Sequence, residues 1–291
     1  MAAESDFPNL VTGRKAGALT FSAIFALESL VRSLNSTVVS LQAYDLLGSS
    51  QKVSELTTLV AMVVLLATLM LPYVLGRLRR RWAYTLGVVG LIAASLFFAS
   101  FTISGQIAGM FLRNCGAGIL NITLSLYIMD HIKKSDLARA EPLRLSLSTF
   151  SWMIGPAGGV WLYTQFGPWA PQLASIAMAV ALLVLFWVLR LSDSATMPSG
   201  TLQPFNPLAN VMRFVRQPRL RLAWMVAFGR SCFWTTFFIY GPLLMVESGV
   251  GKQVGRLMIS ASQVLLLFAY VFGRLAHRFG VRAIISLCFL L

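Results

Sequence analysis

Long apolar runs separated by short polar or basic connectors repeat along the chain. Eight of them contain about 20 residues, the length that a helix needs to cross a hydrocarbon core roughly 30 Å thick. They predict membrane-spanning helices over residues 17–44, 55–76, 83–103, 106–130, 145–165, 171–190, 220–245 and 256–275. A ninth run begins at Val281 and is cut off by the end of the sequence, so we expect a fragment or a truncated gene model.

The composition strengthens this prediction. Hydrophobic residues make up 57% of the 291 residues and charged residues 12%, whereas a soluble domain has about 25% charged residues. The sequence therefore predicts an all-α, polytopic membrane protein. The polar first segment, MAAESDFPNLVTGRK, does not resemble a cleavable signal peptide. Cys115, Cys232 and Cys288 lie within apolar runs, and we interpret them as packing residues.

A formal net charge of +14 would suggest a nucleic-acid partner for a soluble protein, but the positions of the basic residues argue against one. Counted through the predicted spans, one side of the membrane receives Arg14, Lys15, Arg77, Arg79, Arg80, Arg81, Lys133, Lys134, Arg139, Arg144, Arg190, Arg213, Arg216, Arg219, Arg221, Arg274, Arg278 and Arg282. The opposite side receives Lys52, Lys252 and Arg256. Cytoplasmic loops carry an excess of Lys and Arg. We therefore expect a cytoplasmic N-terminus, the plasma membrane (in a bacterium, the inner membrane) and no nucleic-acid partner.

A polar connector divides the chain into two parts. Residues 191–219 are rich in Pro and Ser and contain no run long enough to span a bilayer. We expect a cytoplasmic N-terminus over 1–16, a complete six-helix bundle over 17–190, this cytoplasmic linker, and a partial second bundle of about three helices over 220–291. The phrase GRLRRRW after the second span and GRLAHRFGVR after the eighth are alike, which indicates an internal repeat of the kind found in transporters.

These two segments resemble the basic motif of the major facilitator superfamily, roughly G-x-L-x-D-R-x-G-R. In that family the motif follows helix 2, and a weaker copy of it follows helix 8. Arg80 and His277 stand where the motif has its Asp. In that family the Asp helps to hold helices together in one state of the cycle, so the resemblance leaves this contact in doubt here; His277 is otherwise read as a solvated loop histidine. The matching residues are Gly76, Leu78 and Arg81 in the first copy, and Gly273, Leu275, Arg278, Gly280 and Arg282 in the second.

Two further segments resemble family motifs. FLRNCGAG at 111–118 is similar to the membrane-embedded Arg of helix 4, which would give Arg113 a role in gating. IGPAGG at 154–159 is similar to the helix 5 motif of proton-driven exporters, and this match favours export. Pro156 frees a backbone carbonyl, while Gly155, Gly158 and Gly159 permit close contact between helices and a kink. The alternative is a plain packing contact of small residues.

Polar residues within the apolar runs are the candidate site. Arg32 lies four residues after Glu28, Asn35 seven after Glu28 and Gln42 seven after Asn35, so the four side chains share one face of the first helix. Such a face lines a water-filled cavity or packs inside the bundle, because lipid cannot satisfy it. The fourth span adds Arg113, Asn114 and Asn121, and the seventh adds Arg230.

The charges allow a functional and a structural interpretation. Arg32, Arg113 and Arg230 would surround a substrate path, with Glu28 as a proton site or an ion-pair partner. Three arginines against one carboxylate favour an anionic substrate, because guanidinium binds carboxylate or phosphate with two hydrogen bonds. Alternatively, Glu28 and Arg32 form a structural ion pair.

Transport by alternating access between two bundles is the function that this sequence predicts. The expected carrier is monomeric, works on a small solute in the lipid bilayer, and uses a proton or ion gradient with no cofactor and no metal. A membrane enzyme would need a catalytic set that the two histidines and one mid-membrane carboxylate do not supply. A relative that does not transport, and acts as a sensor or assembly partner, is the remaining alternative.

Overall fold

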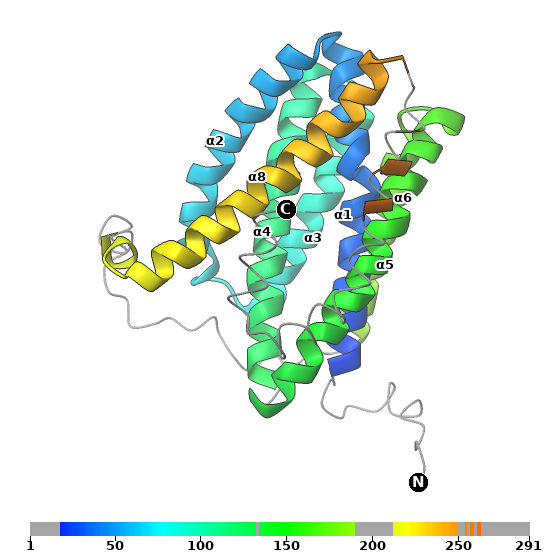
Figure 1. The fold of residues 1–291 in the computed structure, drawn as a ribbon. Coiled ribbons are helices and arrows are strands. Elements are labelled where there is room, and N and C mark those ends of the chain that lie inside the picture. The colour runs from blue at the N-terminus through cyan, green and yellow to red at the C-terminus, as the bar shows by residue number, and fades with distance from the viewer. Residues whose placement is uncertain are drawn as a thin grey trace.

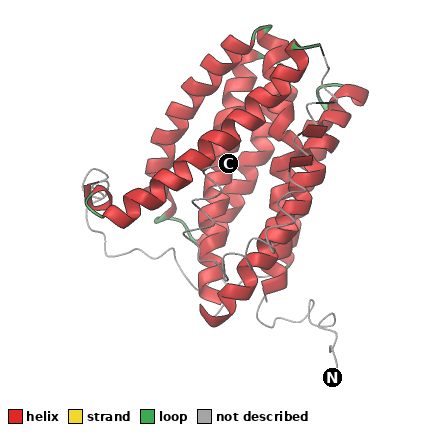
Figure 2. Ribbon diagram, in the orientation of Figure 1, coloured by secondary structure: helices red, strands yellow, loops and turns green. Residues whose placement is uncertain are grey.

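The computed structural model describes residues 18–131, 134–189 and 212–249, with positions 254, 257, 258, 261 and 262. Within these ranges the regular elements are helices (Figure 2). The expected N-terminal segment, most of the linker and eighth span, and the ninth run lie outside the described residues. The helices are α1 (Ala18–Leu47), α2 (Ser50–Leu75), α3 (Arg80–Ala99), α4 (Ile103–His131), α5 (Lys134–Phe166), α6 (Ala170–Val188) and α8 (Pro218–Glu247).

Each of the first seven predicted spans corresponds to one helix, but α2 and α5 begin well before their predicted first residues. The helix α2 begins at Ser50 rather than at 55, and its polar first turns are supported by a hydrogen bond from Gln51 Nε2 to Glu55 Oε1 of 3.0 Å. The helix α5 begins at Lys134 rather than at 145. Hydropathy reports the part of a helix that lies in hydrocarbon, whereas backbone hydrogen bonds continue a helix into water.

The centre of the bundle is built by α1, α3, α4 and α6. Their apolar side chains form one buried cluster, and Figure 1 shows these helices running side by side. Two tyrosines contribute their rings to it: Tyr84 stacks on Phe186 with ring centroids 4.1 Å apart, and Tyr127 meets the same ring edge-on. The buried members are Phe21, Ile24, Val31, Tyr84, Val88, Leu91, Leu120, Leu124, Tyr127, Ile128, Ala179, Leu182 and Phe186.

The helices α1 and α5 pack against each other. By length and composition five helices could cross a membrane: α2, α3, α4, α6 and α8. The remaining pair, α1 and α5, shares the most extensive contact in the bundle. Ser33 Oγ donates to the carbonyl of Ser151 at 2.8 Å, and Ser151 Oγ donates to the carbonyl of Ala26 at 2.7 Å. Reciprocal serine hydrogen bonds between small residues are a common way of joining membrane helices.

Three residues of the IGPAGG segment are buried in this contact: Gly155, Pro156 and Gly159. A Cβ atom on Gly159 would overlap the carbonyl oxygen of Leu34, and one on Gly155 would overlap the side chain of Ser33. The two helices therefore approach so closely that only glycine fits at these positions. The prediction of close helix contact is confirmed at Gly155 and Gly159. It is wrong at Gly158, where a Cβ atom would lie at an ordinary 3.9 Å from Leu34 Cδ2.

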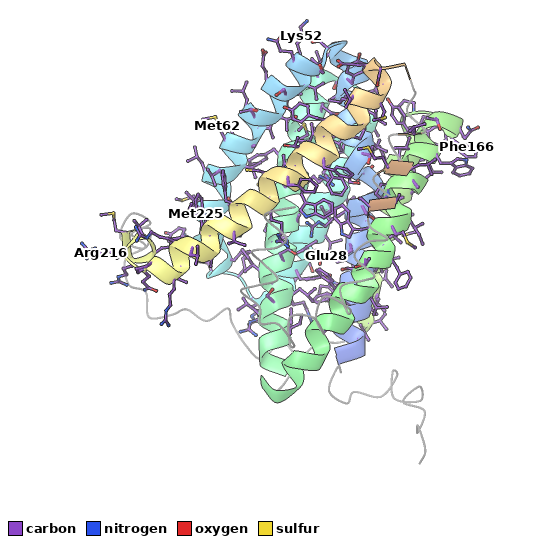
Figure 3. All side chains as sticks on the ribbon, viewed as in Figure 1. Glu28, Lys52, Met62, Phe166, Arg216 and Met225 are labelled. Carbon is purple, nitrogen blue, oxygen red and sulfur yellow. The ribbon has the colours of Figure 1, made fainter. Side chains whose placement is uncertain are left out.

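The helix α8 crosses the bundle at an angle in Figure 1 and touches it through its C-terminal half. The Phe238 ring meets that of Trp152 on α5 at 5.5 Å, and the Tyr240 hydroxyl shares a hydrogen bond with Ser54 Oγ on α2. Leu243 is buried against Ala43 and Val53. The N-terminal half of α8 is exposed, as is most of α2 (Figure 3).

Candidate functional site

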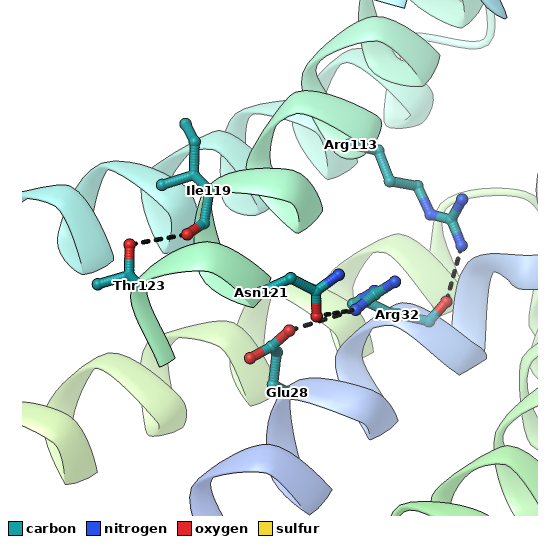
Figure 4. A network of polar contacts seen from close by, with 6 residues as sticks. All are labelled: Glu28, Arg32, Arg113, Ile119, Asn121 and Thr123. Carbon is teal, nitrogen blue, oxygen red and sulfur yellow. Dashed lines mark hydrogen bonds and ion pairs between the residues drawn. The ribbon is translucent and has the colours of Figure 1, made fainter. Parts of the chain in front are cut away.

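A buried carboxylate lies near the middle of α1. Glu28 is 0% exposed and is flanked one turn on either side by Ile24 and Val31, which both belong to the central apolar cluster. Arg32 Nη1 lies 3.3 Å from Glu28 Oε1, and the Arg32 side chain is 23% exposed. The ion pair therefore joins a carboxylate in the apolar core to a partly exposed guanidinium (Figure 4).

The helix α4 extends this pair into a network. Arg32 Nη1 also donates to Asn121 Oδ1 at 3.4 Å, and Arg113 Nη2 donates to the backbone carbonyl of Arg32 at 2.9 Å (Figure 4). A carbonyl carries no formal charge, so this hydrogen bond does not neutralise Arg113. Two guanidinium groups and one carboxylate give the Glu28–Arg32–Arg113–Asn121 network a net positive charge.

A small cavity adjoins the network inside the bundle. Its volume is about 10 Å³, which is room for about one water molecule. Asn35 Oδ1 and Arg113 Nε are buried and have no hydrogen-bond partner among the described residues, and both residues line the cavity. A solute does not fit there in this conformation. The lining residues are Val31, Arg32, Asn35, Leu91, Ala94, Ser95, Phe98, Arg113 and Ser175.

Two asparagines, seven residues apart, share one face of α4. Asn114 and Asn121 are both exposed. Asn114 Nδ2 donates to the carbonyl of Met110 in its own helix at 2.8 Å, so it is not tied to a neighbouring helix by this bond. Asn121 alone of the two joins the network on α1.

Gln42 and Arg230 lie apart from the network. Gln42 is buried; its Nε2 donates to the carbonyl of Phe98 on α3 at 2.6 Å, and its Oε1 accepts from Gln172 on α6 at 3.4 Å. Arg230 is exposed on α8 and makes no hydrogen bond or ion pair with the part of the chain that the structure describes. The structure thus brings together Glu28 and Arg32 with the residues of α4, but not Arg230.

We expect Gln42→Leu to lower stability modestly and to leave transport unchanged. Leucine has a similar size but cannot join α1 to α3 and α6 by hydrogen bonds. Such bonds between membrane helices contribute on average about 0.6 kcal/mol and at most about 1.7 kcal/mol. Unfolding of the purified protein in detergent measures the first effect, and a transport assay the second. Loss of transport at normal stability would instead assign Gln42 to the substrate path.

Uncharged polar residues are the part of the site region that the sequence interpretation missed. Gln106 Nε2 donates to the carbonyl of Val39 at 2.8 Å, and Ser175 Oγ donates to that of Val31 at 3.3 Å. With Gln172 they tie α4 and α6 to α1. Glutamine within or beside an apolar run is the signal that could have found two of them, whereas serine is too common in membrane helices to indicate a contact.

The first basic motif forms the turn between α2 and α3. The amide of Gly76 closes α2 with a hydrogen bond of 3.0 Å to the carbonyl of Pro72, and Leu78 packs on the apolar cluster beneath the turn. Arg80, at the position of the family's Asp, is only 5% exposed, and Arg81 lies over the ring of Trp187. The second motif lies outside the described residues: Gly273, Leu275, His277, Arg278, Gly280 and Arg282.

Comparisons with known proteins agree with the resemblance drawn from the motifs. The family model described as Major Facilitator Superfamily matches residues 21–291. A comparison with individual curated proteins gives no significant match. The family match covers nearly the whole chain, and the apolar helices fit a multi-pass membrane protein. The chain therefore belongs to the major facilitator superfamily, a family of membrane transporters.

Proposed function

We propose that this membrane transporter is a proton-coupled secondary carrier of a small anionic solute, working by alternating access. The observation that carries the proposal is the Glu28–Arg32 pair, in which a fully buried carboxylate holds a partly exposed guanidinium. Ionisable groups at membrane depth are costly and are generally retained for function. The network of net positive charge beside this pair suits an anion better than a cation.

A proton and an anion would bind to opposite partners of the same ion pair, the proton to Glu28 and the anion to Arg32. When Glu28 is ionised, its Oε1 holds Arg32 at 3.3 Å. When Glu28 is protonated, its attraction for Arg32 falls, and the guanidinium becomes available to a carboxylate or phosphate group. Binding of the proton therefore favours binding of the anion. The IGPAGG resemblance indicates export, which stays a prediction. The direction of transport depends on how the proton gradient drives the coupled binding of proton and anion.

We expect the protein in liposomes to move protons when it moves its substrate. Vesicles containing a pH-sensitive dye are exposed to monocarboxylates, dicarboxylates and phosphate esters in turn, with the proton gradient set in either direction. The active anion should produce a proton flux, and Glu28→Gln should abolish that flux because the amide cannot take up a proton. The direction in which a gradient accumulates the anion separates uptake from export.

Glu55→Gln provides the matched control. Glu55 is an exposed carboxylate near the start of α2, so this variant also removes one acidic group but leaves the network intact. It should retain the proton flux of the unaltered protein. Equal fluxes in Glu28→Gln and Glu55→Gln would show that Glu28 is structural. Transport of neutral or cationic solutes alone would contradict the anionic substrate.

A further inference from the structure

A basic patch surrounds the turn between α2 and α3 and has no acidic residue close to it in the sequence. Arg77 and Arg79 are exposed and Arg81 is partly exposed. The chain contains no Asp or Glu between Glu55 and Asp130. Arg77 and Arg79 make no ion pair within the described ranges. The turn between α2 and α3 therefore presents positive charge to its surroundings.

Aromatic rings hold two of these arginines in place. The guanidinium carbon of Arg77 lies 4.2 Å from the centre of the Tyr73 ring, and that of Arg81 lies 5.0 Å from the Trp187 ring. Trp187 also meets Trp82 edge-on at 5.8 Å, and Trp82 is 55% exposed. Exposed tryptophans are enriched where a membrane helix passes from hydrocarbon to headgroups. The two rings therefore mark the level of the interface.

An apolar surface continues from the tryptophans along the bundle. On α3 the residues Leu86 and Val89 follow Trp82 on one face at helical spacing, and both are exposed. On α6, which packs against α3, Val180 and Val184 are exposed on the side that leads to Trp187. Positive charge, interfacial tryptophan and exposed aliphatic side chains thus succeed one another along α3 and α6.

The start of α3 adds to the local positive potential. The N-cap residue, Arg79, makes no side-chain capping hydrogen bond, and the first turn contains no acidic residue. A helix N-terminus carries a partial positive charge from its free N–H groups, so arginine there is unfavourable unless an anion is present. The general excess of Lys and Arg in cytoplasmic loops, which sets the orientation of a membrane protein, depends only on charge. That excess does not explain why these arginines stack on aromatic rings at one end of the apolar surface of α3 and α6.

We propose that Arg77, Arg79 and Arg81, with Trp82 and Trp187, bind an anionic phospholipid of the adjacent leaflet. The lipid phosphate lies among the three guanidinium groups, the tryptophans contact the glycerol region, and the acyl chains lie on α3 and α6. This site is separate from the Glu28–Arg32–Arg113–Asn121 network, and it assigns a role to the basic motif that does not need the missing Asp.

The test measures lipid binding to the purified protein in a neutral detergent. Dioctanoyl phosphatidylglycerol, dioctanoyl phosphatidylcholine and inorganic phosphate are compared by native mass spectrometry and by the rise in melting temperature. Each arginine near an anionic headgroup strengthens binding about fivefold. The variant Arg77→Gln/Arg79→Gln/Arg81→Gln should therefore bind phosphatidylglycerol about 100-fold more weakly.

The matched control removes three arginines from the same end of the bundle. Arg213, Arg216 and Arg219 precede or begin α8, are exposed, and lie over no aromatic ring within the described residues (Figure 3). The variant Arg213→Gln/Arg216→Gln/Arg219→Gln should bind phosphatidylglycerol as the unaltered protein does. Equal losses in the two triple variants would overturn the proposal, because they would show attraction by total charge.

Two measurements on the unaltered protein are independent of how well the variants fold. Phosphatidylglycerol should bind more tightly than phosphatidylcholine, and rising salt should weaken only the first, because salt screens charge. Equal binding of the two lipids would overturn the proposal. Inorganic phosphate that stabilises the protein as much as phosphatidylglycerol would overturn the lipid assignment and leave a site for free anions.

Discussion

Replacing Gly159 by alanine is expected to separate α1 from α5 and to destabilise the bundle. The new methyl group would overlap the carbonyl oxygen of Leu34, and a backbone atom cannot move aside as a side chain can. Overpacking of this kind costs about 1–3 kcal/mol. The hydrogen bonds between Ser33 and Ser151 lie in the same contact and would lengthen with it. Denaturant or thermal unfolding of the purified protein in detergent measures the loss.

The neighbouring Gly158 is the matched control for this prediction. A Cβ atom there would lie 3.9 Å from Leu34 Cδ2, an ordinary van der Waals contact. Alanine is favoured over glycine within a helix by about 1 kcal/mol, so Gly158→Ala should be neutral or stabilising. The two substitutions are chemically identical and adjacent, yet only Gly159→Ala should lower stability. Equal effects would contradict the close approach of α1 and α5.

Replacing Arg32 by glutamine is expected to destabilise the protein more than replacing Glu28 by glutamine. The first change removes the ion-pair partner of a carboxylate that is 0% exposed, and breaking a buried ion pair in this way costs about 3–5 kcal/mol. The second change leaves Arg32, which is partly exposed and can extend its charged end toward water. The asymmetry follows from the different burial of the two partners. Unfolding of both single variants measures it.

The double variant Glu28→Gln/Arg32→Gln tests the pair directly. It removes both charges, so it should be more stable than Arg32→Gln alone, with a coupling energy of about 0.5–3 kcal/mol. Arg219→Gln, which removes an exposed arginine at the start of α8, should change stability by no more than about 0.5 kcal/mol. Additive effects of the two network substitutions would mean that Glu28 and Arg32 do not stabilise each other.

Periodicity predicts the helices well, because burial of apolar residues in hydrocarbon dominates their sequence. The polar face of α1 could be predicted for the same reason: Glu28, Arg32 and Asn35 stand out in an apolar run and share one side of the helix. The early start of α5 at Lys134 could not, since residues outside hydrocarbon follow no hydropathy rule.

The partners of the polar residues could not be predicted from the sequence. The spacing of Gln42 from Glu28 indicates a shared face, but the acceptors that satisfy Gln42 and Arg113 are backbone carbonyls of other helices. Every residue type carries such a carbonyl, so no sequence pattern marks these acceptors. The same holds for the overlap of Gly159 with Leu34, which depends on how closely two backbones approach.

The burial of Glu28 beneath Arg32 has a kinetic consequence. The carboxylate is inaccessible to solvent, so a proton can enter or leave only after the surrounding side chains or helices have moved. Rotamer changes of exposed side chains take picoseconds to nanoseconds, whereas local opening of packed helices takes microseconds or longer. Titration of Glu28 would therefore be slow and would follow the opening rate rather than the supply of protons. The rate of the proton-transfer step in the transport cycle would then be set by the packing around Glu28 and not by the acidity of the solution.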